Sequence, residues 1–388
     1  MGDTRHRRVA RRVGGAGVKR LVLAGGGHAH IEVLRRFGDE PMGDVEVVLV
    51  SPAADTPYSG MLPGLVAGHY SWRDCHIDLD ALTRHAGAKF RQTCVIGIDP
   101  AQRHIVCDSG LVLGWDVLSL DIGSTPPVGD VDGAAQHGIT VKPVERFLVA
   151  WEGIVARAIT EPLRVVAVGG GAGGVELCLA MQHRLASTPQ AQPCDVTLVT
   201  QSATIVPEYA QGARRRLRAA FARHGIGLLA GVAVTAVEDD GLVLANGARV
   251  PADVVVWTTG AAAPVWLRDT GLALDARGFV EVDEHLQSTS HPGVFAAGDV
   301  AAYRGKQVPK SGVYAVRQGP PLADNLRLAL EAKPLLPWKP QRRTLALLST
   351  GDARAVAVWG SWSAEGSWVW RWKNHIDTRF VQRYRMAP

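Results

Sequence analysis

The sequence predicts an α/β fold with two parallel sheets, because one glycine-rich pattern occurs twice along the chain. The first copy begins at Gly25 and the second at Gly169, 144 residues later. Each follows a short aliphatic run, at 21–24 and 165–168, of the kind that forms buried parallel strands. Each copy then leads into a helical pattern. The repeated order of strand, turn and helix predicts two Rossmann-like domains.

The function of such a turn depends on this context. Its glycines let backbone N–H groups approach a pyrophosphate at the N-terminus of the following helix. One copy alone would be weak evidence, since an ordinary strand–loop–helix also contains glycine. Two copies in the same context indicate two dinucleotides bound side by side, most simply FAD and the co-substrate NAD(P)H.

The first copy departs from the usual pattern at two positions. Gly25 and Gly27 occupy the first two glycine positions, but His30 stands where a third glycine or alanine usually allows close packing. The second strand of such a domain commonly ends in a carboxylate that bonds the ribose. Ser51 stands there instead, and its hydroxyl can make one such bond.

The second copy is more regular, with Gly169, Gly171 and Gly174 all present. Its second strand reaches Thr200, which is neither the acid that favours NAD nor an arginine that favours NADP. The arginines at 214–216 could reach a 2′-phosphate or could form the solvated face of their helix. The choice between NADH and NADPH therefore stays open.

The composition is that of a folded globular protein, with 388 residues, 47% hydrophobic and 20% charged. The net charge of +5 is mild, and much of the excess precedes the first strand. We expect residues 1–17 to be a disordered basic arm rather than an export signal. A solvated arm is favoured over a nucleic-acid contact, so we expect no nucleic-acid partner.

The five cysteines show neither a C-x-x-C pair nor metal-ligand spacing. We therefore expect free thiols, no metal site and a cytoplasmic location. The sequence contains no run of about 18 apolar residues, so no membrane span is expected.

The order of predicted elements indicates that the second domain is inserted into the first. We assign 18–142 and 269–333 to an FAD-binding domain and 143–268 to an NAD(P)-binding domain. Residues 334–388 form a C-terminal segment with six of the eleven tryptophans. Helices are predicted over 144–159, 212–224 and 310–330, and strands over 45–50, 196–199, 253–257 and 294–297.

The strand over 294–297 runs into Gly298 and Asp299. An acid at a strand end beside a helix start suits a hydrogen bond to a ribitol or ribose hydroxyl, although a helix N-cap is the alternative. Beside two glycine turns, we favour the cofactor contact.

Together these motifs resemble the two-dinucleotide-binding flavoproteins, which include type II NADH dehydrogenases and sulfide:quinone oxidoreductases. The motifs are the two turns and the segments 121–124, 258–260 and 294–299. Three further segments, 56–70, 310–321 and 368–373, are more specific. They resemble the pyridine nucleotide-disulfide oxidoreductase family protein often fused ahead of selenide, water dikinase. The resemblance covers 19–385 and implies the flavoprotein module standing alone, with the kinase as a candidate partner.

The resemblance implies a set of cofactor-binding residues. Those for FAD are Gly25, Gly27, His28, Ala29, His30, Ser51, Pro52, Met61, Pro63, Val95, Asp121, Gly123, Gly298, Asp299 and Gln318. Those for the nicotinamide nucleotide are Gly169, Gly171, Ala172, Gly174, Glu176, Thr200 and Gly260.

Two departures from the resembling families bear on the electron acceptor. The absence of a redox dithiol excludes electron transfer through an internal cysteine pair of that kind, and Cys178 is expected to be a packed thiol. Type II dehydrogenases usually carry Ala-Gln-x-x-x-Gln-Gln beside the quinone, whereas this chain has Gly312-Val313 and Arg317-Gln318. A quinone acceptor therefore stays open.

The C-terminal segment contains a candidate contact surface. Trp368, Trp372, Ile376 and Phe380 recur every four residues, with the cations Arg371, Lys373, Arg379 and Arg383 between them. Such a helix could lie on a membrane surface, or it could dock on the flavin domain or on a second copy in a homodimer. We favour docking.

These observations indicate an FAD-dependent NAD(P)H oxidoreductase that passes hydride from nicotinamide to flavin and then to an unidentified small-molecule acceptor. The resemblance adds a link to selenium metabolism. We expect Glu176 to orient the nicotinamide, and Lys310 and Gln318 to act on the other flavin face. The alternatives are a sulfide- or selenide:quinone oxidoreductase-like flavoenzyme and a non-catalytic flavin-binding redox partner.

Overall fold

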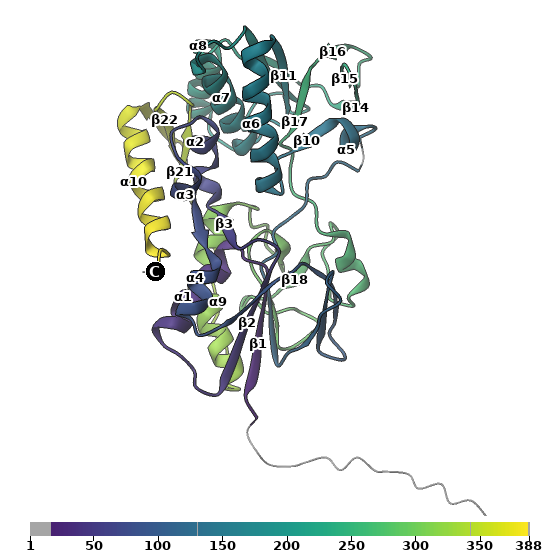
Figure 1. Cartoon of the computed structure of the whole chain (residues 1–388), viewed down its shortest axis with the longest axis vertical. Helices are drawn as coiled ribbons and strands as arrows, with labels where there is room; N and C mark the ends of the chain where they lie inside the picture. Colours follow the sequence, from purple (N-terminus) through teal and green to yellow (C-terminus); the bar gives the residue numbers. More distant parts are fainter. Residues whose placement is uncertain (1–16, 130, 342, 387–388) are drawn as a thin grey trace, which may run out of the picture.

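The computed structural model describes residues 17–129, 131–341 and 343–386. The basic arm predicted over 1–17 lies outside the described residues, except for Gly17. The chain forms two lobes that follow each other along the long axis, with the C-terminal helix α10 beside them (Figure 1).

The first lobe is built on a five-stranded sheet in which every neighbouring pair is parallel. Its aliphatic strands are largely buried on both faces, as parallel sheets require. Helices α1 (His28–Asp39) and α9 (Gly312–Leu330) pack against each other beside it. In spatial order the strands are β19 (Val294–Ala296), β9 (Val117–Leu120), β1 (Lys19–Ala24), β2 (Val45–Ser51) and β5 (Lys89–Gln92).

The second lobe repeats this sheet, with the strand that precedes the glycine turn again at its centre. Its helices are α6 (Val144–Thr160), α7 (Ala172–Ser187) and α8 (Gln211–Arg223). In spatial order its parallel strands are β10 (Gly138–Thr140), β17 (Val254–Trp257), β11 (Leu163–Val168), β12 (Cys194–Thr200) and β13 (Gly227–Ala230).

In the sequence, the edge strands β5 and β13 are each followed by a small antiparallel sheet. The duplication therefore extends beyond the glycine turns. The sheet of the first lobe contains β6 (Val95–Asp99), β7 (His104–Cys107) and β8 (Val112–Gly114). That of the second lobe contains β14 (Val234–Glu238), β15 (Gly241–Leu244) and β16 (Arg249–Pro251). The predicted α/β fold with two Rossmann-like sheets is confirmed.

Shorter elements connect these parts. They are β3 (Asp55–Pro57), η1 (Ser59–Met61), α2 (Leu62–Val66), α3 (Trp72–Cys75), β4 (His76–Asp78), α4 (Leu79–His85), α5 (Ala134–His137), η2 (Val265–Asp269), β18 (Val280–Val282), η3 (Gly298–Val300) and β20 (Ala301–Tyr303). Helix α2 belongs to the first half of the sequence but packs on α7 of the second lobe. It therefore joins the two lobes.

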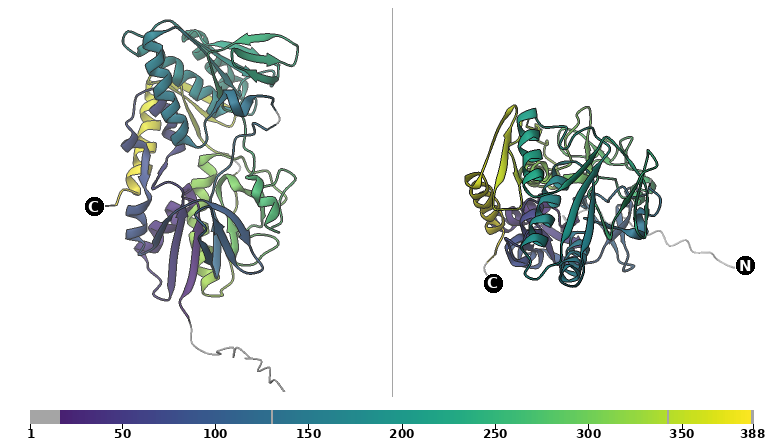
Figure 2. Two further views of the ribbon diagram at one scale, coloured as in Figure 1. Left: turned by 45° about the vertical axis from the view of Figure 1, so that its right-hand side comes forward. Right: turned by 90° about the horizontal axis from the view of Figure 1, so that it is seen from above.

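The C-terminal segment also contacts both lobes. It forms a three-stranded antiparallel sheet, β21 (Ala346–Ser349), β22 (Ala355–Trp359) and β23 (Trp362–Gly366), followed by α10 (Ser367–Arg383). Leu348, Val356 and Val358 join the core of the second lobe, whereas Phe380 and Val381 join that of the first. Figure 2 shows this yellow segment running beside both lobes.

Two sequence predictions need correction. The helix predicted from Lys310 begins at Gly312 and continues through Pro320 and Pro321. The exposed apolar stripe of the C-terminal helix stops before Phe380, because a four-residue step turns the helix about 40° too far, and three steps add up to about 120°. Trp368, Trp372 and Ile376 are exposed, but Phe380 is buried.

Candidate active site

The two glycine turns have the same backbone geometry. Gly25 and Gly169 both have positive φ, 97° and 128°, which favours glycine. Each donates its N–H to the second strand of its own sheet, Gly25 to Val50 O at 2.7 Å and Gly169 to Val199 O at 2.9 Å. The turns are therefore equivalent in structure as well as in sequence.

The last residue of each second strand, β2 or β12, lies against the glycine turn of its lobe. A Cβ built on Gly26 would lie 3.1 Å from Ser51 Oγ, and one on Gly170 would lie 2.7 Å from Thr200 Oγ1. Both hydroxyls are buried beside the turn, where the sequence predicted a ribose contact.

The second turn leaves open space at its second glycine and is close-packed at its third. A Cβ on Gly171, directly before Ala172 at the start of α7, would meet nothing within 4 Å. At Gly174 a Cβ would come within 2.1 Å of Gly169 O, so this position requires glycine for close packing of the helix on the strand. The chain therefore leaves the approach to the α7 N-terminus open, as a bound pyrophosphate requires.

In the first turn, His30 stands at the position of the third glycine, and its side chain forms hydrogen bonds within the fold. Its imidazole is fully buried and lies 2.7 Å from Gly25 O and 2.8 Å from Ser119 Oγ. Burial lowers its pKa to about 4. Because both ring nitrogens have partners within the fold, the predicted contact of His30 with FAD does not involve its side chain.

Asp121 lies at the N-terminus of α1. Its carboxylate accepts the backbone N–H groups of Ala29, at 2.8 Å, and His30, at 3.3 Å. Burial raises the pKa of Asp121 to about 7, although the two hydrogen bonds act to lower it. The equivalent residue in the second turn is Thr258, whose hydroxyl donates to Val168 O at 2.9 Å. An acid at this position is specific to the first turn.

His28, the first residue of α1, faces the C-terminal helix. Its ring centroid lies 5.6 Å from that of Tyr58 and 6.2 Å from that of Phe380. Its Nε2 accepts the N–H of Ser59 at 3.4 Å. Burial lowers the pKa of His28 to about 4, so the ring is neutral. His28 thus lies between the first turn and the segment from Tyr58 to Pro63, which contains the predicted FAD-binding residues Met61 and Pro63.

Asp299 forms a polar cluster that the sequence did not reveal. Its Oδ2 accepts from Lys142 Nζ at 2.8 Å and from Ser124 Oγ at 3.1 Å, and Lys142 also donates to Ser124. Burial raises the pKa of Asp299, but the charge of Lys142, the hydrogen bonds from Lys142 and Ser124 and the charge of Lys310 together leave the pKa below its usual value. Asp299 is therefore an ionised acceptor at the start of η3.

Gln318 and Lys310 lie beside this aspartate. Gln318 Oε1 accepts the N–H of Gly298 at 2.7 Å, and Gly298 has φ of 68°. Lys310 Nζ donates to Ala301 O and lies 3.8 Å from the ring centroid of Phe279. Burial lowers the pKa of Lys310 to about 8. The structure thus brings Gly298, Asp299, Lys310 and Gln318 to one small cavity.

The remaining predicted residues are spread over both lobes, since Gly260 follows β17 of the second lobe. Met61 and Pro63 are buried in η1 and α2, and Val95 is buried at the start of β6. Pro52 is exposed directly after Ser51. Gly123 and Gly260 close the segments after β9 and β17, and a Cβ at Gly123 would meet no atom within 4 Å.

Glu176 meets the C-terminal sheet. Its Oε1 accepts the N–H of Ser349 at 2.8 Å. Burial raises the pKa of Glu176 to about 7, with the charge of Lys373 acting in the opposite direction. The predicted nicotinamide-orienting residue is thus also a link between α7 and β21.

Lys373 and Asp377 form a buried ion pair, which corrects the sequence interpretation of Lys373 as a surface cation. Lys373 Nζ donates to Asp377 Oδ2 at 2.6 Å and to Gly60 O at 2.5 Å. Asp377 also accepts the hydroxyl of Tyr58. The i, i+4 spacing was the available sequence signal, but it is equally common on solvated helix faces.

Comparison with known proteins then assigns the family. Residues 19–319 match the family described as pyridine nucleotide-disulphide oxidoreductase. The chain belongs to this family. Its FAD-binding and NAD(P)H-binding oxidoreductase character follows from that membership and agrees with the two turns described above.

Individual relatives agree with this assignment. The chain is 28% identical to an NADH dehydrogenase-like protein of Mycobacterium tuberculosis, over 93% of this chain and 94% of the relative. It is 25% identical to a demethylphylloquinone reductase of Synechocystis, over 86% and 85% of the two chains. The solved sulfide:quinone oxidoreductase of Aquifex aeolicus has the same fold, with a TM-score of 0.78, 20% identity and coverage of 95% and 91%.

Within the described residues, no helix is long and apolar enough to cross a lipid bilayer.

Proposed function

We propose that this oxidoreductase takes hydride from NADH or NADPH at the second turn and delivers electrons through FAD to a small acceptor of the quinone type. The observation that carries the proposal is the matched pair of turns, with Asp299, Lys310 and Gln318 beside the first. When bound, FAD supplies the redox chemistry, and the protein positions and tunes it. The name of the Synechocystis relative supports a quinone acceptor.

In this proposal, each of the site residues has a separate role. The open α7 N-terminus at Gly171 admits the nucleotide, and Glu176 orients its nicotinamide end. Asp299 accepts a ribitol hydroxyl, while Lys142 keeps that carboxylate ionised. Gln318 positions the Gly298–Asp299 turn, so it acts through the backbone rather than on the reacting atoms.

We propose 18–142 and 269–333 as the FAD-binding domain and 143–268 as the NAD(P)-binding domain. The membership of β19 in the first sheet supports this discontinuous first domain. By the same division, 334–388 is a separate segment that contacts both.

Mixing the purified holoprotein with NADH or NADPH in a stopped-flow instrument tests the proposal. Rapid bleaching near ~450 nm, the band typical of oxidised flavin, is expected. Bleaching with sulfide but not with nucleotide would instead indicate a sulfide-oxidising flavoenzyme. Bleaching with neither would leave a flavin-binding redox partner.

A single substitution tests whether the two nucleotide sites are separate. Gly171→Leu places a side chain in the open space before α7 and should abolish reduction by nucleotide while FAD stays bound. Gly153→Leu, on α6 of the same lobe, is the matched control, because a Cβ there also meets no atom within 4 Å. Loss of FAD from the Gly171 variant would contradict separate sites.

We further propose a link to selenium metabolism through a selenide, water dikinase partner and a cytoplasmic location. The support is the resemblance of 56–70, 310–321 and 368–373. When the two purified proteins are mixed, we expect them to form a complex that elutes together and the kinase rate to change.

We propose that the exposed apolar surface of the C-terminal segment is a contact surface for a second copy of the chain. It comprises Trp359, Trp362, Trp368, Trp372 and Ile376. Exposed apolar patches of this kind commonly mark interaction sites. Sedimentation should show a dimer that Trp368→Ser disrupts. Co-sedimentation of the wild-type protein with anionic vesicles would indicate peripheral membrane contact instead.

A further inference from the structure

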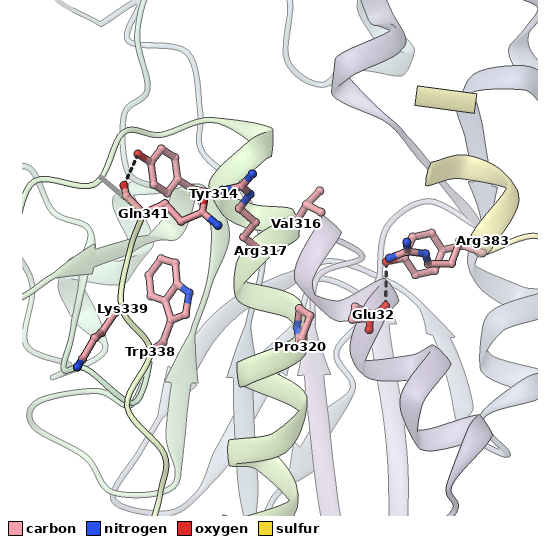
Figure 3. Close-up of a pocket in the computed structure, with 10 residues that line it drawn as sticks. Glu32, Tyr314, Val316, Arg317, Pro320, Trp338, Lys339, Gln341 and Arg383 are labelled. Carbon is pink, nitrogen blue, oxygen red and sulfur yellow. Dashed lines mark hydrogen bonds between the residues drawn. The ribbon is translucent and has the colours of Figure 1, made fainter. Parts of the chain in front are cut away.

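A groove on the outer face of α9 has a volume of about 290 Å³. This volume lies near the lower end of the range for small-ligand sites. Figure 3 shows the connector residues Trp338 and Gln341 on one side, facing Tyr314 and Arg317 of α9. The far side is closed by Glu32 of α1 and Arg383 at the end of α10.

The groove is adjacent to the proposed flavin site. Tyr314 lines the groove and also the small cavity that contains Asp299, Lys310 and Gln318. Its hydroxyl donates to Gln341 O at 3.3 Å, which fixes the ring against the connector. A ligand in the groove is therefore separated from the proposed flavin site by one aromatic side chain and the first turn of α9.

The charge of the groove is positive. Its one acid, Glu32, is already bonded by Arg35, at 2.9 Å and 3.0 Å, by Arg36, at 3.0 Å, and by the Tyr384 hydroxyl, at 2.9 Å. Arg317, Lys339 and Arg383 then contribute three cationic side chains to the lining. The electrostatic field of the groove favours an anion.

Arg317 shows where that anion would bind. Its Nη1 is buried and has no hydrogen-bond partner among the described residues. A buried donor without a partner costs free energy that a ligand acceptor would recover. The nearby rings of Tyr314 and Trp338 supply flat apolar surface for the rest of such a ligand.

We infer that this groove binds the electron acceptor and that the acceptor is a planar aromatic anion, such as a quinone bearing a sulfonate or carboxylate group. The inference rests on the proposed function and specifies its substrate class. Arg317 is the groove cation on α9 that would pair with the acidic group, so it sets the charge that this site prefers.

The redox balance is complete with the reactants named. Reduction of a naphthoquinone to its hydroquinone consumes two electrons and two protons. Both electrons and one proton come from the nicotinamide by way of the flavin. The second proton comes from solvent, to which the groove is open.

Calorimetric titration of the oxidised holoprotein with naphthalene-2-sulfonate tests the binding without turnover. Saturable binding is expected, and Arg317→Gln should weaken it about tenfold, since a charge-assisted bond becomes a neutral one. Lys339→Gln, on the exposed connector, should weaken it about threefold. Arg157→Gln on α6, away from the groove, is the matched control. Equal binding by wild type and both groove variants would overturn the inference.

Steady-state rates supply a second measurement. The ratio of kcat/KM for 1,4-naphthoquinone-2-sulfonate to that for 1,4-naphthoquinone should fall about tenfold in Arg317→Gln. Because the ratio compares two acceptors on one enzyme, a general loss of activity leaves it unchanged. An unchanged ratio would contradict the inference. Absence of flavin bleaching by nucleotide would instead contradict the proposed function, independently of the binding result.

Discussion

Replacing Asp121 with asparagine should make the protein more stable at neutral and alkaline pH. The carboxylate is buried at the α1 N-terminus, where glycines pack around it. A Cβ on Gly27 would lie 2.3 Å from Asp121 Oδ1, and one on Gly298 would lie 2.4 Å from the same atom. The site is therefore tight and excludes solvent from the charge.

The sign of the effect follows from proton linkage. Burial raises the pKa of Asp121 from 3.8 to about 7, so the folded protein binds this proton more tightly than the unfolded chain. The carboxyl group therefore lowers stability progressively as pH rises from about 4 to about 7. Each pKa unit corresponds to about 1.4 kcal/mol, so the loss of stability reaches at most about 4 kcal/mol at pH values above about 7.

Urea unfolding at pH 5 and pH 8, with equal excess FAD throughout, measures this effect. The stability of Asp121→Asn relative to wild type should increase by about 2–3 kcal/mol between these pH values. Asp44→Asn, an exposed acid on the same lobe, is the control. Parallel pH curves for wild type and Asp121→Asn would refute the reasoning. The variant should also retain FAD better at pH 8, because the pyrophosphate no longer shares a helix N-terminus with a second anion.

Three other outcomes are expected. Glu176→Gln should remove a pH dependence with a midpoint near 7 from the stopped-flow rate of flavin reduction, because burial raises the pKa of Glu176 to about 7; a midpoint that persists in the variant would contradict this. Lys373→Met should lower the free energy of unfolding by about 3 kcal/mol, because it leaves Asp377 as an unpaired buried charge, and adding Asp377→Leu should restore most of the loss; urea denaturation that finds the double variant no more stable than the single one would exclude the ion-pair argument. Asp299→Ala should reduce the FAD content after gel filtration at least tenfold relative to Asp283→Ala, and equal flavin absorbance in both would remove Asp299 from the cofactor site.

The part of the fold that could be predicted from sequence is the part specified by local pattern. An aliphatic run, a glycine turn and a helical period all lie within about 30 residues, so the two Rossmann-like units were recognisable without tertiary information. The limits of β2, α6 and α8 lie within one residue of those predicted. The pattern located Gly171 and Gly174, and the structure adds that a Cβ at Gly171 would meet no atom within 4 Å, whereas one at Gly174 would lie 2.1 Å from Gly169 O.

The polar contacts of the site could not be predicted in this way, because their partners are distant in sequence. Lys142 and Asp299 are 157 residues apart, and Lys373 lies 313 residues from Gly60. Nothing local distinguishes Lys142 from a surface lysine. His30 was recognised as unusual, but only the fold shows that its imidazole is buried and hydrogen-bonded to the hydroxyl of Ser119.

The position of the C-terminal segment has a consequence for synthesis of the protein on the ribosome. Ser349 bonds Glu176 in one lobe and Lys373 bonds Gly60 in the other, yet both donors belong to the last 40 residues. Both sheets are complete before these donors are translated. Until Ser349 and Lys373 are translated, the carboxylate of Glu176 and the carbonyl of Gly60 remain hydrated in the nascent chain, and the contacts that this segment makes with both lobes form only afterwards.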